Sequence, residues 1–272
     1  MLGIVQGLTE FLPISSSAHL RIVAALSGWD DPGAAFTAVT QIGTETAVVI
    51  YFRHDIGRIL AAWFRSLRHA EHRSDPDARM GWLVLLGSLP IGILGLLLED
   101  SIDSAFRDLR LTATTLIVFG ILLGIADRVG AKRRTLDQLT VRHGILYGLA
   151  QAMALIPGVS RSGGTITAGL LLGYRREAAT RYAFLLAVPA VFASGFYKLT
   201  DIGDSSATSW GPTVVASVIA FGVGWAVIAW LMRFITTRSY LPFVAYRLVL
   251  GALLLVLVSI AVLDPSAGHD AL

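Results

Sequence analysis

The sequence predicts an all-α polytopic membrane protein with about six transmembrane helices and two re-entrant hairpins of broken helix, arranged as an inverted-topology repeat. Of the 272 residues, 54% are hydrophobic and only 15% are charged, whereas soluble domains carry about 25% charged residues. Long apolar stretches recur with lengths close to the ~20 residues that a helix needs to cross the hydrocarbon layer. Two further apolar stretches are interrupted by proline, glycine and serine. A single membrane domain is therefore expected over residues 1–272.

Six apolar stretches are predicted to cross the membrane as helices. They cover residues 36–52, 80–98, 112–127, 182–199, 212–232 and 244–263. Several are shorter than ~20 residues, which indicates a thin local bilayer or helix ends that lie a few residues further out. The interrupted stretches are 1–27 and 143–173. Because proline and glycine break a helix, each of these is predicted to form a hairpin instead of a full crossing.

Arginine and lysine in short loops predict which side of the membrane each loop occupies. Loops 53–79 and 128–142 are basic, and so are residues 175–181. Both ends of 143–173 are therefore predicted on the cytoplasmic side, so this segment enters the membrane and returns to the same face. Acid-rich segments are predicted outside, which makes 1–27 a hairpin that dips from the external face. Their acidic residues are Asp30, Asp31, Glu99, Asp100, Asp103, Asp108, Asp201, Asp204, Asp264 and Asp270.

Two hairpins that enter from opposite faces are what an inverted repeat produces, and a short sequence similarity supports one. Residues 3–8 resemble residues 144–149, and each segment is followed by a proline and then by a serine cluster. We expect repeat 1 over about 1–127 and repeat 2 over about 143–263. Irregular backbone at membrane depth is tolerated only where protein or water surrounds it, so the two hairpin tips are predicted to meet at a hydrated central site.

Ionisable side chains inside apolar segments are candidates for that site. Those that we place there are Glu10, His19, Arg21, Glu45 and Arg161. A charged group at the centre of a bilayer costs about 2.5–3.5 kcal/mol on insertion scales. Grouped around one wet cavity, residues of opposite charge compensate each other.

Residues 157–165 of the second hairpin form the strongest motif in the chain. Glycines permit a tight turn, and a helix predicted over about 165–173 would direct free N–H groups at an anion. Arg161 adds a planar guanidinium that suits phosphate oxygens. The alternative is a glycine-rich helix break in which Arg161 pairs with Glu45 or Glu10. The candidate phosphate-binding residues are Ser160, Arg161, Ser162, Gly163 and Thr165.

The first hairpin supplies complementary chemistry. Gln6 and Glu10 are one helical turn apart and therefore face the same side. Their oxygens are suitable ligands for a divalent cation, which would bridge phosphate groups. Alternatively, Glu10 serves as a general base. The serine run 15–17 follows, with His19 close behind, and a serine hydroxyl beside a histidine can act as a nucleophile or as a donor to the transferred phosphoryl group.

Structural roles compete with these functional ones. The serines can cap a helix, and His19 can be a satisfied buried histidine. Glu45 is a plausible partner of Arg161 or Arg21, and a simple ion pair between helices is an equally good interpretation. Taken together, the oxyanion cradle, basic group, carboxylate and hydroxyls favour hydrolysis of a phosphate ester or anhydride. A lipid diphosphate is the natural substrate, because its hydrophobic part can stay in the bilayer.

Composition excludes several other classes. The chain has no cysteine, which excludes disulfides, zinc thiolate sites, iron–sulfur clusters and cysteine nucleophiles. The net charge is +3, but the basic residues lie in short loops between apolar segments, so no nucleic-acid partner is expected.

At these residues the sequence resembles the bacitracin-resistance type of undecaprenyl-diphosphate phosphatase, a family of bacterial membrane enzymes. The resemblance covers essentially the whole chain, and its signatures lie at residues 6–19 and 157–165. It implies an enzyme of the bacterial cell (inner) membrane that removes the terminal phosphate from the C55 isoprenoid diphosphate, so that the carrier lipid is reused in cell-wall synthesis. It also implies a divalent cation such as Mg²⁺ or Ca²⁺, a catalytic centre open to the external face, and a homodimer.

Residue by residue, the resemblance places the acidic motif of the family on Gln6 and Glu10, which become the metal ligands. The essential serine falls on Ser16 and the histidine on His19, and the phosphate-binding loop covers residues 160–165. Gln6 is neutral at a position where the family often has glutamate, which removes one candidate carboxylate. The expected catalytic residues are Glu10, Ser16, His19 and Arg161. The expected phosphate-binding residues are Ser15, Ser17, Ser160, Arg161, Ser162, Gly163 and Thr165.

A second functional class also fits the sequence. Lipid flippases and anion transporters use inverted repeats with broken helices, whose ends bind anionic substrates. A soluble-type acid phosphatase is not favoured, because no histidine follows residues 160–161 at the spacing that a phosphohistidine mechanism needs.

Overall fold

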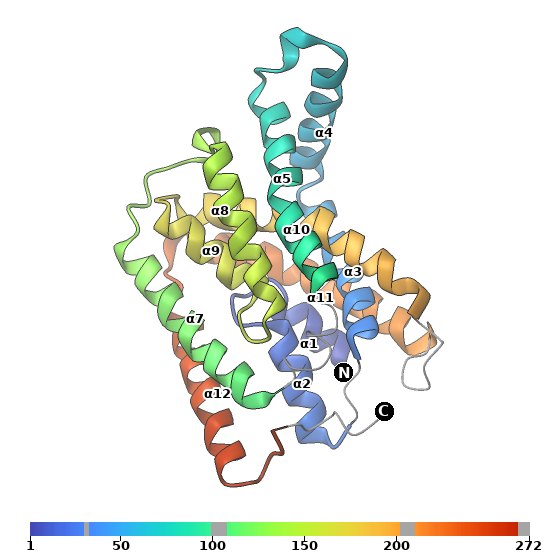
Figure 1. Cartoon of the computed structure of the whole chain (residues 1–272), viewed down its shortest axis with the longest axis vertical. Coiled ribbons are helices and arrows are strands. Elements are labelled where there is room, and N and C mark those ends of the chain that lie inside the picture. The colour runs from blue at the N-terminus through green and yellow to red at the C-terminus, as the bar shows by residue number, and fades with distance from the viewer. Residues whose placement is uncertain (30–32, 99–107, 202–209, 266–272) are drawn as a thin grey trace.

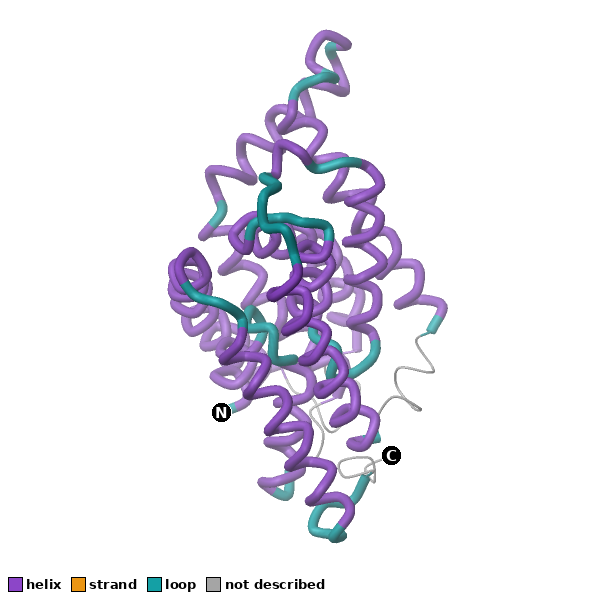
Figure 2. The backbone as a smooth tube through the Cα atoms, turned by 90° about the vertical axis from the view of Figure 1, so that its left-hand side faces the viewer, coloured by secondary structure: helices purple, strands orange, loops and turns teal. Residues whose placement is uncertain are grey.

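The computed structural model describes all residues except 30–32, 99–107, 202–209 and 266–272. Figure 1 and Figure 2 show a bundle of helices elongated along one axis, and the described residues contain no β-strand. The α-helices are α1 (Leu2–Thr9), α2 (Ser16–Ser27), α3 (Gly33–Tyr51), α4 (Arg53–Arg68), α5 (Pro76–Leu97), α7 (Leu109–Val129), α8 (Val141–Ala152), α9 (Arg161–Leu171), α10 (Arg176–Tyr197), α11 (Trp210–Thr237) and α12 (Leu241–Ser259).

Five of these helices are long and apolar enough to cross a membrane. They are α5, α7, α10, α11 and α12. They confirm the prediction of an all-α polytopic membrane protein. Five of the six predicted crossings are found among them.

The sixth predicted crossing, residues 36–52, forms α3, which is not one of the five long apolar helices. By length and apolarity alone, the described residues therefore contain five candidate transmembrane helices and not about six. Threonine, glutamine and glutamate lower the hydropathy of α3. The helix packs against α10 and α11, and this protein environment explains how its polar side chains are accommodated.

A helix that the sequence analysis did not predict, α4, lies within the basic segment 53–79. It buries Ile59 and Ala62 and packs against α5. Figure 1 shows that the α4–α5 pair extends beyond the other helices. The charge pattern predicts only a basic loop here, whereas apolar side chains recur among the arginines at helical spacing.

Both interrupted segments are broken helices, as predicted. The first is divided into α1 and α2, and the second into α8 and α9. The second returns to the side from which it starts, because Arg134 N donates to Gly173 O at 2.9 Å and Arg175 N donates to Arg134 O at 2.9 Å. These bonds join the loop before α8 to the loop after α9 and confirm the predicted hairpin.

The two hairpins share further features that support the predicted repeat, whose boundaries remain a prediction. Ser15 and Ser160 directly precede α2 and α9, with φ angles of 74° and 72°. Positive φ is uncommon for residues other than glycine. In each hairpin the hydroxyl of this serine lies near that of the serine two positions later, at 3.2 Å from Ser17 and 3.1 Å from Ser162. The packing is also reciprocal, since α1 lies against α11 and α8 against α5.

The helix of the second hairpin begins earlier than the sequence predicted. It covers Arg161–Leu171 instead of about 165–173. Ser160 Oγ accepts a hydrogen bond from Gly163 N at 3.1 Å and so caps the helix at its N-terminus. Arg161 is consequently the first residue of α9.

The predicted orientation in the membrane rests on loops at the two ends of the molecule. In Figure 1 the α4–α5 connection lies at the top, whereas the N-terminus and the end of α12 lie in the lower half. Much of the acid-rich sequence lies outside the described residues. This applies to Asp30, Asp31, Glu99, Asp100, Asp103, Asp204 and Asp270.

Close packing of α8 on α5 yields a first prediction. A Cβ added to Gly148 would collide with the carbonyl oxygen of Gly87, which is backbone and cannot move aside easily. We expect Gly148→Val to lower the free energy of unfolding by about 1–3 kcal/mol. Gly222→Val is the matched control, because an added Cβ there meets no atom within 4 Å. Thermal unfolding in detergent measures both, and equal midpoints for the two variants would contradict the packing argument.

Candidate active site

Glu10 is the centre of the candidate site. It is buried at the C-terminal end of α1. One carboxylate oxygen, Oε2, accepts hydrogen bonds from Gln6 Nε2 at 2.7 Å and from Ser16 Oγ at 2.5 Å. The other, Oε1, accepts from Arg161 Nη2. The structure thus brings together four residues that the sequence predicted for one site.

Two helix N-termini converge on this carboxylate. Ser16 is the first residue of α2 and Arg161 the first residue of α9, and both donate to Glu10. The first N–H groups of a helix lack partners within the helix, and its dipole attracts anions. The place occupied by the Glu10 carboxylate is therefore also suited to phosphate oxygens.

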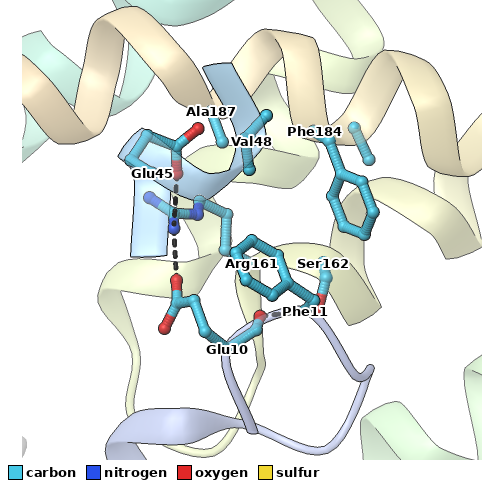
Figure 3. Close-up of a pocket in the computed structure, with 9 residues that line it drawn as sticks. Glu10, Phe11, Glu45, Val48, Arg161, Ser162, Phe184 and Ala187 are labelled. Atoms are coloured by element: carbon cyan, nitrogen blue, oxygen red, sulfur yellow. Dashed lines mark hydrogen bonds and ion pairs between the residues drawn. The ribbon is translucent and has the colours of Figure 1, made fainter. Parts of the chain in front are cut away.

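Arg161 lies between two carboxylates. Figure 3 shows its guanidinium between Glu10 and Glu45, with Nη2 at 3.8 Å from Glu45 Oε2. Only 16% of the Arg161 side chain is exposed, against 4% for Glu10 and 1% for Glu45. The predicted partnership of Glu45 with Arg161 is confirmed, and apolar side chains cover the pair, which strengthens electrostatic interactions inside.

The cavity at this ion pair is small. The cavity volume is about 10 Å³, which is roughly enough for one water molecule. Its lining residues are Glu10, Phe11, Glu45, Val48, Arg161, Ser162, Ala183, Phe184 and Ala187. A phosphate group does not fit into this volume while Glu10 and Arg161 are in contact.

Several of the predicted phosphate-binding residues form hydrogen bonds within the protein, and their role toward phosphate stays a prediction. Thr165 Oγ1 donates to the carbonyl of Arg161 at 2.7 Å, within α9. Ser162 Oγ donates to Leu12 O at 3.1 Å and so joins the two hairpins. Gly163 contributes the backbone N–H that Ser160 caps. These groups maintain the shape of the turns, whereas Ser16 contacts the carboxylate itself.

His19 lies one helical turn after Ser16. Its Nδ1 is 2.7 Å from Ser15 O, and its Nε2 is 2.7 Å from Tyr246 Oη. The imidazole also stacks on Tyr246, with ring centroids 5.5 Å apart. Nδ1 therefore anchors the turn at Ser15 and Nε2 joins it to α12, and the proton-transfer role of His19 stays a prediction.

The predicted metal ligands can be compared with what a cation requires. Within the described residues, no group of three or more His, Asp or Glu side chains is arranged to hold a metal ion. Gln6 Oε1 is nevertheless buried and has no hydrogen-bond partner there, and it belongs to the side chain that contacts Glu10. A carboxylate and an amide oxygen suit Mg²⁺ or Ca²⁺, whose shell in phosphate sites is completed by water and substrate.

Arg247 of α12 is a residue that the sequence analysis missed. It is fully buried. Its Nη1 donates to Pro13 O at 3.0 Å, and its Nη2 donates to Gly158 O at 2.8 Å. One side chain thus binds the turns of both hairpins. The signal was present in the sequence, because an arginine interrupts the apolar stretch 244–263.

The cap of α9 gives a second prediction. Ser160→Ala removes the acceptor of the Gly163 N–H group and places alanine at a φ of 72°. We expect a loss of about 1–2 kcal/mol in the free energy of unfolding, and only a few tenths for Ser160→Gly. Both variants lose the hydroxyl, but glycine tolerates positive φ. The difference in stability between them therefore measures the backbone strain at this position. Equal unfolding midpoints in detergent would refute this account.

The chain is similar in sequence to known proteins of one family. Residues 1–253 match the family model described as "Bacitracin resistance protein BacA". The chain is 63% identical to "Undecaprenyl-diphosphatase 2" of Streptomyces coelicolor, over 99% of this chain and 97% of the relative. It is 65% identical to "Undecaprenyl-diphosphatase" of Thermobifida fusca (99% and 92%) and 64% identical to that of Micrococcus luteus (97% and 97%). The chain belongs to the bacitracin resistance protein BacA family.

Proposed function

We propose that this chain is an undecaprenyl-diphosphatase, which hydrolyses undecaprenyl diphosphate to undecaprenyl phosphate and inorganic phosphate. The observation that carries the proposal is the convergence of Ser16 and Arg161, from two broken helices, on the carboxylate of Glu10. The names of relatives at 63–65% identity support the same reaction. The product is the carrier lipid that cell-wall synthesis reuses.

Ser16 is the proposed nucleophile. Its hydroxyl already donates to Glu10 Oε2 at 2.5 Å, so Glu10 is positioned as the general base. Oγ forms a bond to the terminal phosphorus while its proton passes to Glu10. The bond between that phosphorus and the bridging oxygen breaks, and its electron pair leaves with undecaprenyl phosphate. Water then hydrolyses the phosphoserine and restores the hydroxyl. Water activated directly by Glu10 is the alternative nucleophile.

Arg161 binds the phosphate oxygens in this proposal. When the diphosphate enters, the guanidinium separates from the Glu10 carboxylate, because the pocket is too small while the two are in contact. Its planar donors can then bind two oxygens of one phosphate group. The N–H groups at the start of α2 and α9 add fixed dipoles in an environment of low dielectric, where such groups stabilise developing charge well.

A divalent cation, Mg²⁺ or Ca²⁺, is the proposed cofactor. Gln6 Oε1 and a Glu10 oxygen would hold it. When bound, it would neutralise charge on the diphosphate.

We further propose that the enzyme acts in the bacterial cell (inner) membrane with its site open to the external face, and that it forms a homodimer. The basic segments around α4 and before α8 support a cytoplasmic position for the end of the molecule at the top of Figure 1. The apolar helices allow the isoprenoid chain to remain in lipid. A flippase or an anion transporter has no support from the named relatives.

Nucleophile and base yield a third prediction. In detergent, where no compartments exist, the purified chain is expected to release phosphate from C55 diphosphate. Glu10→Gln is expected to lower kcat about 10²- to 10⁴-fold, the usual contribution of a general base. With labelled C55 diphosphate, quenched reactions of the wild type are expected to contain labelled phosphoserine. Ser16→Ala is expected to abolish both this label and turnover. Ser66→Ala, a buried serine of α4, is the control. Turnover without any labelled serine would identify water as the nucleophile.

The cation gives a fourth prediction. A chelator is expected to stop phosphate release, and added Mg²⁺ or Ca²⁺ to restore it. Gln6→Glu adds a carboxylate beside Glu10, so it should lower the cation concentration needed for half-maximal activity. Unchanged activity in the chelator would exclude the proposed cofactor.

A further inference from the structure

We propose that Arg247 is a positioning residue and that its positive charge favours binding of the diphosphate. This inference rests on the proposed function and assigns a role to a residue outside both sequence signatures. Arg247 acts through the turns that carry Ser16 and Arg161, and it supplies a buried cation that the bound substrate neutralises.

The contacts of Arg247 join three parts of the chain. Its Nη1 donates to Pro13 O at 3.0 Å in the first hairpin and to Val159 O at 3.2 Å in the second. Its Nη2 donates to Gly158 O at 2.8 Å, and its Nε donates to Leu116 O of α7 at 3.1 Å. Pro13 lies three residues before Ser16, and Val159 lies two before Arg161. Arg247 therefore fixes the separation of the two turns that begin α2 and α9.

Arg247 also lies directly against the first turn of α9. A Cβ added to Gly163 would stand 3.0 Å from Arg247 Nη1. The glycine of the phosphate-binding motif thus leaves room for this guanidinium. The positive charge is consequently close to the helix N-terminus at which we place the phosphate.

The charge of Arg247 lacks an acidic partner. In the part of the chain that the structure describes, no carboxylate oxygen lies within ion-pair distance of its guanidinium, and the acceptors given above are all backbone carbonyls. Arg161, by contrast, pairs with Glu10, and Arg176 pairs with Asp127 at 2.6 Å. A buried cation without a counter-ion is unfavourable, so an anion that binds at the start of α9 relieves part of that penalty and gains affinity.

Substitutions can separate the charge of Arg247 from its hydrogen bonds. Arg247→Lys keeps the charge but cannot reach all the carbonyls, whereas Arg247→Gln keeps a donor and loses the charge. Both are expected to lower the unfolding midpoint. If the charge serves the diphosphate, only Arg247→Gln should raise KM for C55 diphosphate, by tenfold or more relative to Arg247→Lys. Arg176→Gln is the matched control, which should lower the unfolding midpoint while KM is unchanged.

A binding measurement makes the test independent of turnover. Inorganic pyrophosphate is the probe, and the shift that it causes in the unfolding midpoint is measured for each protein in detergent. The wild type and Arg247→Lys are expected to be stabilised, and Arg247→Gln is not. Equal KM values and equal pyrophosphate shifts in the lysine and glutamine variants would overturn the proposal, as would a wild type that pyrophosphate does not stabilise. A wild type that binds pyrophosphate but releases no phosphate from C55 diphosphate would instead overturn the proposed function alone.

Discussion

The structure depends on how a single buried carboxylate, Glu10, is satisfied. An isolated charge inside a membrane protein is costly, and it persists only where other groups compensate it. Glu10 receives donors from α1, α2 and α9, so its stability requires both hairpins to be in place. The positive φ angles before α2 and α9 and the hydrogen bonds of Arg247 position these donors. The ion pair and the proposed catalytic arrangement therefore depend on the same contacts.

Much of this arrangement was predictable from the sequence, because membrane insertion leaves few solutions for polar groups. Proline, glycine and serine inside apolar segments identified both hairpins. The cost of burying Glu10 and Arg161 indicated that they compensate each other, and the structure pairs them. Basic residues at both ends of 143–173 predicted a return to the same face, which the bonds between residues 133–134 and 173–175 confirm.

Other features depend on contacts that a sequence pattern does not encode. The partners of Arg247 are backbone carbonyls from three distant segments, and every residue has a carbonyl. Tyr246, which binds His19, lies 227 positions away. The early start of α9 results from a positive φ at Ser160 that serine rarely adopts. The number of arginines in segment 53–79 predicts a loop charge but not α4, because it carries no information on the helical face that each arginine occupies.

The small volume beside Arg161 has a consequence for the end of the catalytic cycle. The Glu10 carboxylate already pairs with Arg161, so any anion that binds this guanidinium must compete with Glu10. This competition weakens the retention of inorganic phosphate, which gains no affinity from a lipid tail. A diphosphate with its long isoprenoid chain has additional binding energy from the bilayer-facing helices. Self-neutralisation thus favours departure of the inorganic phosphate that hydrolysis of the phosphoserine releases.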